Sequence, residues 1–233
     1  MKKRSVNNMD LTFSLRRKEI VEAEPLVSEV RERWPALFTE EQASIICAEF
    51  YRITTVDLMH TFHVSLEKHS AQLIRLYRAR CGAFGDNMQS LLDKLDEQTS
   101  DIVAHRKRTA LKGLPLFLRE KPGNLLKTYL DTDPEERYTK GVKVGIITVV
   151  EDDVASSNSL PTVTSVAIVL EEVFEDVCDL PTAFALLFCL LYALNIDFPK
   201  ELKYTFDVIQ QVLMDLGSQC SARVQSLKTK LLL

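Results

Sequence analysis

The sequence is poor in glycine and has no hydrophobic run long enough to cross a membrane. Only seven of its 233 residues are glycine, which disfavours glycine-rich phosphate-binding loops and turn-rich folds of many strands, and favours helices. The apolar stretch at residues 183–194 has twelve residues and no charge, whereas a membrane helix needs about 20. We therefore expect no membrane association, and we interpret this stretch as a helix that other elements cover on every face.

Sequence motifs for catalysis are also missing. We find no nucleophile elbow of the Gly-x-Ser-x-Gly type, no Walker loop and no dinucleotide-binding fingerprint. These absences predict a protein that is not an enzyme and that uses no cofactor.

The cysteines do not form a recognisable framework. Cys47, Cys81, Cys178, Cys189 and Cys220 are scattered without CxxC spacing, and an odd number of cysteines suits free thiols in a reducing compartment. The first residues carry positive charge but no apolar run typical of a secretion signal. We expect an intracellular protein, in the cytoplasm or the nucleus.

The composition is that of a folded globular protein. Hydrophobic residues make up 46% and charged residues 27% of the chain, which argues against disorder. The formal net charge is -4, and dedicated nucleic-acid-binding domains usually carry a strong basic excess. The charge therefore disfavours nucleic-acid binding as the main function.

The chain is expected to fall into three parts. Residues 1–24 are predicted to be a flexible basic and polar tail, residues 25–113 a helical region, and residues 114–233 an α+β region that is either separate from the helical region or continuous with it. A long helix that begins at Asp86 is predicted to end at Gly113 and Pro115.

The α+β region contains the strand signals. Residues 142–150 and 163–170 are rich in β-branched side chains and are bounded by turn residues, which predicts two strands, and residues 173–177 could return as a short third strand. Residues 124–130 are expected to form one or two helical turns. The core helix is predicted at residues 182–195.

The predicted fold class is mainly α within the α+β class. We expect a helical N-terminal half and a small antiparallel β-hairpin or meander packed on the C-terminal helices, because two or three strands cannot bury both of their faces alone. The side chains expected at the centre of the core are those of Phe184, Leu187, Phe188 and Leu191.

One metal-binding hypothesis comes from two histidines. His60 and His63 lie three residues apart on a predicted helix, close enough to share a metal ion. A zinc site needs three or four converging ligands, and Cys47 and Glu67 are the only candidates nearby in the sequence. A metal-dependent enzyme around His60 and His63 is therefore the third-ranked hypothesis, and no residue is assigned as a metal ligand.

Basic side chains form two clusters on predicted helices. Residues three or four apart share a helix face, so either cluster could contact phosphates or an acidic partner. The first cluster comprises Arg75, Arg78 and Arg80, and the second comprises Arg106, Lys107, Arg108 and Lys112.

Three stretches carry a resemblance to a known family. Residues 110–118 (ALKGLPLFL), residues 130–136 (LDTDPEE) and residues 180–200 resemble the C-terminal region of vertebrate, mostly fish, sterile alpha motif domain-containing protein 3-like proteins. The resemblance covers most of residues 33–233 and is strongest from residue 110 onward. It implies a folded domain with no assigned enzymatic activity, cofactor or catalytic residue. The self-associating sterile alpha motif itself does not map onto residues 1–80.

The leading functional hypothesis is a non-enzymatic intracellular interaction module. An exposed helix face or the edge of the small sheet would bind another protein or a second copy of the chain. The first alternative is a nucleic-acid-binding protein that uses the basic faces at residues 75–80 and 106–112, and the second is the metal-dependent enzyme.

Overall fold

The structure, a computed structural model, describes residues 9–38, 42–134, 138, 141–152, 162–171, 173–217 and 220–232. It divides the chain into two units that alternate along the sequence. Unit 1 comprises residues 1–59 and 128–197, and unit 2 comprises residues 60–127 and 198–233. Residue 113, after which a boundary between regions is expected from the sequence, lies within helix α7 (Ile102–Phe117). Each unit is built from two segments that are not consecutive in the sequence.

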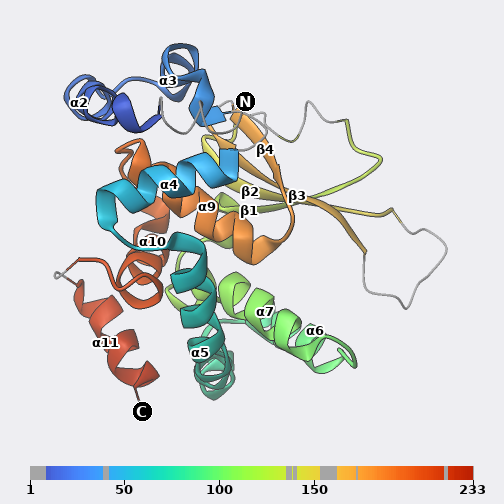
Figure 1. The fold of residues 1–233 in the computed structure, drawn as a ribbon. Helices are drawn as coiled ribbons and strands as arrows, with labels where there is room; N and C mark the ends of the chain where they lie inside the picture. The colour runs from blue at the N-terminus through green and yellow to red at the C-terminus, as the bar shows by residue number, and fades with distance from the viewer. Residues whose placement is uncertain are drawn as a thin grey trace. The chain divides into compact units, whose positions relative to one another are not determined.

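Unit 1 contains the sheet and the apolar helix (Figure 1). Strand β1 straddles the boundary at residue 128 and is grouped here with the sheet it joins. The elements of this unit are α2 (Phe13–Ala23), α3 (Val27–Arg33), η1 (Pro35–Phe38), α4 (Gln42–Thr54), β1 (Leu126–Leu130), β2 (Val144–Val150), β3 (Val163–Leu170), β4 (Val173–Val177) and α9 (Leu180–Ala193).

The sheet has the strand order β1-β2-β3-β4. Strands β2, β3 and β4 form the predicted antiparallel meander, with Val144 opposite Leu170 and Val166 opposite Val177. Strand β1 differs from the helical turns expected at residues 124–130. The Asp131 N–H just after β1 donates to the carbonyl of Val150 at the end of β2, at 2.9 Å, so these two strands end side by side and the sheet is mixed. Pairing with β2, a tertiary contact, gives this segment its conformation.

Helix α9 is the predicted core helix. The side chain of Asp179 caps it by accepting a hydrogen bond from the Thr182 N–H at 2.8 Å. The helix packs against α4 and against strands β2 and β3 (Figure 1). All four side chains expected at the centre are at most 1% exposed, which confirms the prediction; they are Phe184, Leu187, Phe188 and Leu191.

The flexible tail predicted at residues 1–24 is wrong for the described part of that segment, which contains α2; residues 1–8 lie outside the described residues. Arg16 of α2 is fully buried and makes two hydrogen bonds to the carboxylate of Glu49 on α4, at 2.9 and 2.6 Å. A buried charge needs such a partner. The partner lies 33 residues away, so local sequence gives no sign that this segment is ordered.

Unit 2 is helical in its described residues. Its elements are α5 (Leu58–Ala79), of which the first two residues belong to unit 1, η2 (Cys81–Ala83), α6 (Asp86–Asp96), α7 (Ile102–Phe117), η3 (Pro122–Asn124), η4 (Lys200–Leu202), α10 (Lys203–Val208), the π-helical turn η5 (Ile209–Leu213) and α11 (Ala222–Leu231).

The long helix predicted from Asp86 is two helices, and Gly113 does not end the second one. Helix α7 continues through Gly113 to Phe117. A Cβ atom at Gly113 would lie 2.5 Å from Cε2 of Tyr77, so this glycine allows α7 to approach the Tyr77 ring. Its role is close packing instead of helix termination.

The fold class is confirmed as mainly α with a small sheet. Among the described helices, none combines the length and the apolar character that crossing a membrane would need.

Candidate functional site

The first predicted basic cluster lies at the C-terminal end of α5. Arg75, Arg78 and Arg80 are all exposed. Arg75 donates to Oε1 of Gln72 at 3.3 Å, and Arg78 forms an ion pair with Asp96. Arg80 differs from the other two because it lines a pocket.

The second predicted basic cluster, on α7, is partly neutralised or withdrawn from solvent. Lys107 pairs with Glu67 at 3.0 Å and holds the pKa of that carboxyl below its usual value. Burial lowers the pKa of the Lys112 ammonium, and the nearby charges of Lys94 and Arg108 lower it further. Arg106 and Arg108 are half-buried. None of these four residues joins Arg80 at the pocket.

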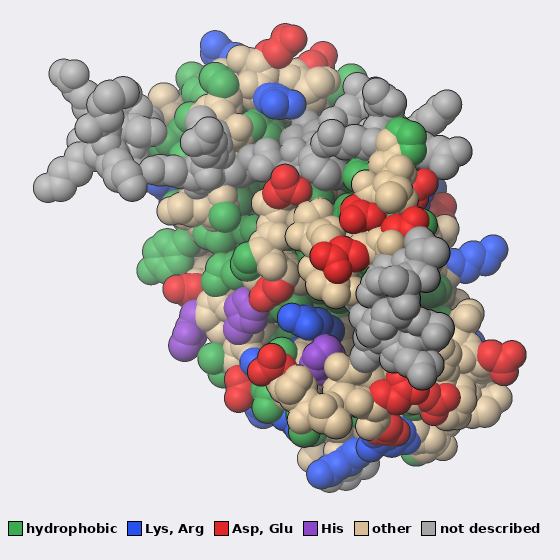
Figure 2. Space-filling model, turned by 90° about the vertical axis from the view of Figure 1, so that its right-hand side faces the viewer, with side chains coloured by type: hydrophobic (Ala, Val, Ile, Leu, Met, Phe, Trp, Pro, Cys, Tyr) green, Lys and Arg blue, Asp and Glu red, His purple; other side chains and the backbone are tan. Residues whose placement is uncertain are grey.

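Acidic side chains accompany basic ones on the molecular surface. On the face presented in Figure 2, Lys and Arg side chains lie next to Asp and Glu side chains over the part that is coloured. A mixed surface of this kind produces a weaker long-range field than a basic stripe does.

The described part of the structure gives no support for a metal site at His60 and His63. Within the described residues, no three His, Cys, Asp or Glu side chains gather in a way that could hold a metal ion. His63 packs edge-on against the ring of Phe62, with the ring centroids 5.8 Å apart.

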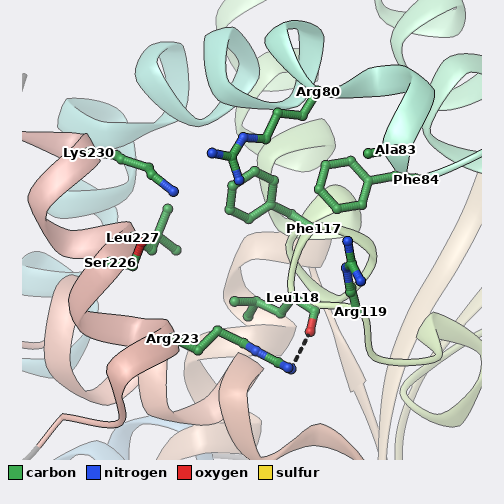
Figure 3. Close-up of a pocket in the computed structure, with 10 residues that line it drawn as sticks. All are labelled: Arg80, Ala83, Phe84, Phe117, Leu118, Arg119, Arg223, Ser226, Leu227 and Lys230. Atoms are coloured by element: carbon green, nitrogen blue, oxygen red, sulfur yellow. Dashed lines mark hydrogen bonds between the residues drawn. The ribbon is translucent and has the colours of Figure 1, made fainter.

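A pocket of about 340 Å³ lies within unit 2. It is built from the end of α5 and the turn η2, the end of α7, and one face of α11 (Figure 3). Its volume is at the lower end of the range for small-ligand sites. The lining residues are Arg80, Ala83, Phe84, Phe117, Leu118, Arg119, Arg223, Ser226, Leu227 and Lys230.

Four of the lining side chains are cationic, and no carboxylate of the described residues lines the pocket. Arg223 already has partners within the protein. Its Nη1 donates to the carbonyl of Leu118 at 2.9 Å, and its guanidinium carbon lies 4.2 Å from the centre of the Tyr204 ring. The hydrogen bond holds the end of α7 near α11 and the ring contact holds α10 near α11, so Arg223 acts mainly as a structural cation.

Arg80, Arg119 and Lys230 make no side-chain hydrogen bond or ion pair with any described residue of the chain. Figure 3 shows the guanidinium of Arg80 and the amino end of Lys230 pointing into the same space. Like charges that converge raise the free energy of the site unless an anion lies between them. The pocket therefore has the electrostatic character of an anion-binding site.

Arg119 is presented by a left-handed residue at the end of α7. Its φ angle is 57°, in the region that favours glycine. The Arg119 N–H donates to the carbonyl of Leu116 at 3.0 Å, and the Glu120 N–H donates to that of Pro115 at 2.9 Å. This is the Schellman arrangement, with an arginine where glycine is usual.

Glu120 fixes the segment that carries Arg119. Its carboxylate accepts hydrogen bonds from the N–H of Tyr204 at 2.7 Å, the N–H of Thr205 at 3.0 Å and the hydroxyl of Thr205 at 2.6 Å. Burial nonetheless raises the pKa of Glu120. Glu120 makes these hydrogen bonds as a charged carboxylate, because backbone N–H groups donate to its oxygens.

One family model matches the chain. The helical domain of sterile alpha motif domain-containing protein 3 matches residues 3–39. No curated protein and no solved structure matches significantly. The matched segment includes α2 and α3 and overlaps the residues of the sequence resemblance only at 33–39.

The segment of the family match also exposes apolar side chains. Leu11 is 82% and Leu26 is 58% exposed, and Leu15 and Val21 are also exposed. Leu15 and Val21 lie on α2, whereas Leu11 precedes its N-cap residue Thr12.

Sequence reasoning found one of the four pocket cations, Arg80. It missed Arg119, Arg223 and Lys230, which come from two segments more than 100 residues apart. The single available signal was the helix stop predicted near Pro115, since a residue just after a helix end is often presented to solvent.

Proposed function

We propose that this chain is a non-enzymatic intracellular interaction module that binds an anionic group of a protein partner between Arg80 and Lys230, in a pocket that Arg119 also lines. The observation that carries the proposal is a pocket with three cationic side chains that no carboxylate of the described residues neutralises. An anion in this position would offset the repulsion between the charges of Arg80 and Lys230.

Two further observations agree with an interaction module. The match of residues 3–39 to the helical domain is compatible with a role in protein interaction. The resemblance of the later residues to the C-terminal region of the same proteins, which implies no assigned enzymatic activity, extends the proposed relationship beyond the matched segment.

The nucleic-acid alternative makes a different prediction. Binding by the two basic clusters would depend on Arg75 and Arg78 as much as on Arg80, because nucleic-acid affinity follows the number of phosphates neutralised. Binding in the pocket would depend on Arg80 alone among these three, since Arg75 and Arg78 do not line it.

Equilibrium unfolding in urea with inorganic phosphate tests the anion site. At a phosphate concentration about 100 times the Kd, binding stabilises the folded state by about 2.7 kcal/mol. We expect this gain in the wild-type chain and in the R75Q variant, which keeps the pocket intact. We expect it to be lost in the R80Q/K230Q double variant.

Equal stabilisation of all three proteins would overturn the proposal. A filter-binding assay with a single-stranded oligonucleotide, run on the same proteins, addresses the alternative. Retention that R75Q weakens as much as R80Q/K230Q does would favour nucleic-acid binding by the α5 cluster.

A further inference from the structure

One wall of the pocket is aromatic. The rings of Phe84 and Phe117 have their centroids 5.2 Å apart at an interplanar angle of 45°, and both are half-buried. Phe117 in turn packs against Tyr77 at 5.4 Å. Tyr77 is fully buried and donates its hydroxyl hydrogen to the carbonyl of Ala110 at 2.7 Å, so the wall has a fixed support.

The cations approach this wall from different segments. Arg80 follows α5, Arg119 follows α7, and Lys230 lies on α11 (Figure 3). The guanidinium of Arg80 and the ammonium of Lys230 can together donate to several oxygens at once. A phosphate monoester offers three acceptor oxygens and a charge of about −1.5 to −2 at neutral pH.

An aromatic wall next to a group of cations fits a ligand that has both a ring and a phosphate. Building on the proposed function, we propose that this pocket binds the side chain of a phosphorylated tyrosine in a partner protein. Its ring would pack on Phe84 and Phe117, and its phosphate would lie between Arg80 and Lys230, while Arg119 adds positive charge from the other side of the rings (Figure 3).

Other anionic side chains satisfy only part of this pocket. Phosphoserine has no ring to cover the two phenylalanines, and glutamate brings a single charge. Unphosphorylated tyrosine would leave the three cations without a counter-charge. The aromatic wall should therefore give an aryl phosphate a higher affinity than an alkyl phosphate of equal charge.

Isothermal titration calorimetry with one peptide in four forms tests the inference. The forms carry tyrosine, phosphotyrosine, phosphoserine or glutamate at the same position. We expect the phosphotyrosine form to bind about tenfold more tightly than the phosphoserine form, because an aromatic pair adds up to about 1.5 kcal/mol. The tyrosine form should not bind measurably.

Variants test the aromatic and the cationic residues of the pocket independently. F84L should bring the affinities of the phosphotyrosine and phosphoserine forms to within about twofold of each other, since the ring contact is lost and the apolar character is kept. R119Q should weaken both phosphorylated forms. R75Q is the matched control on α5 and should change neither, and far-ultraviolet circular dichroism confirms that each variant is folded.

The outcomes distinguish this inference from the proposed function. If both phosphorylated forms bind equally in the wild-type chain, the anion site stands and the preference for an aryl phosphate is wrong. If neither form binds and phosphate does not stabilise the chain, both proposals fall.

Free phenyl phosphate should bind at the same place. If the partner is a protein, the peptide should bind more tightly than phenyl phosphate. A 5′-phosphorylated oligonucleotide that outcompetes the phosphotyrosine peptide would overturn the inference.

Discussion

At the scale of single residues, one arginine in each unit shows a different use of charge. In unit 1, Arg16 is fully buried and paired with Glu49, so its charge serves the fold. In unit 2, Arg119 has a left-handed backbone conformation and an exposed side chain in a pocket without acidic residues in its described lining. A strained residue at a binding site often indicates that the side chain has a function there.

Replacing Arg119 by glycine should raise stability and lower anion binding. A left-handed conformation costs a residue other than glycine about 1–2 kcal/mol, and part of that gain is lost because glycine is more flexible in the unfolded chain. We expect the free energy of unfolding of R119G to rise by up to about 1 kcal/mol, while phosphate affinity falls. Urea unfolding and calorimetric titration measure the two effects.

Asparagine at this position is the control. It tolerates the left-handed conformation and carries no charge, so R119N should also lose phosphate affinity. If R119G were less stable than the wild-type chain, the arginine side chain would be stabilising the end of α7, and the strain argument would be wrong.

At the scale of elements, the crossing of α5 and α7 supports the aromatic wall. Gly113 brings α7 close to Tyr77, and Tyr77 supports Phe117. The position of the pocket wall thus depends on a residue that does not line the pocket. This dependence can be measured by adding a single methyl group.

The G113A variant is expected to lose about 1–3 kcal/mol of stability, the usual effect of overpacking a core. The new Cβ would lie 2.5 and 2.9 Å from two carbons of the Tyr77 ring, and the hydrogen bond of Tyr77 to Ala110 resists a shift of that ring. Urea unfolding measures the loss.

Gly82 offers a matched substitution. A Cβ at Gly82 meets no atom within 4 Å, so G82A should change the free energy of unfolding by less than about 0.5 kcal/mol. Equal effects of G82A and G113A would show that the helix crossing tolerates a side chain and that the supporting role of Gly113 is wrong.

At the scale of the whole molecule, a cationic pocket occurs in a chain of net charge -4. Net charge therefore describes solubility and long-range behaviour, whereas binding depends on the local arrangement of charges. The contacts of exposed charges are screened by salt, so affinity for an anion should fall as ionic strength rises.

The pH dependence of binding should follow the ligand. The described lining contains no histidine or carboxylate, and the second pKa of a phosphate monoester is about 6. Affinity for phenyl phosphate should therefore fall as pH decreases from about 7 to 5, because the dianion becomes a monoanion. Calorimetric titration at several pH values measures this fall.

Sulfate distinguishes titration of the ligand from titration of the protein. Sulfate keeps its double charge over this range, so its affinity should stay constant if only the phosphate titrates. The pKa of Glu120 is raised by burial, and protonation of Glu120 as the pH falls would loosen the segment that carries Arg119. A parallel loss of sulfate affinity at low pH would place the pH dependence in Glu120 instead of in the ligand.

The apolar helix and two strands could be predicted because their signals are local. The run at residues 183–194 and the β-branched residues at 163–170 contain enough information to define α9 and β3. The helical segment at residues 9–23 and strand β1 could not be predicted, because Arg16 depends on Glu49 and β1 depends on its pairing with β2. The candidate site was predicted only through Arg80.

The amino-acid sequence by itself determined the fold class and the buried centre of unit 1, since hydrophobic periodicity and composition act over short distances along the chain. Only the tertiary structure decided which charges pair and which remain open. Arg78 and Lys107 pair with carboxylates, whereas Arg80, Arg119 and Lys230 line one pocket. The physical reason is that electrostatic partners are chosen by distance in space, and spacing along the sequence does not contain that distance.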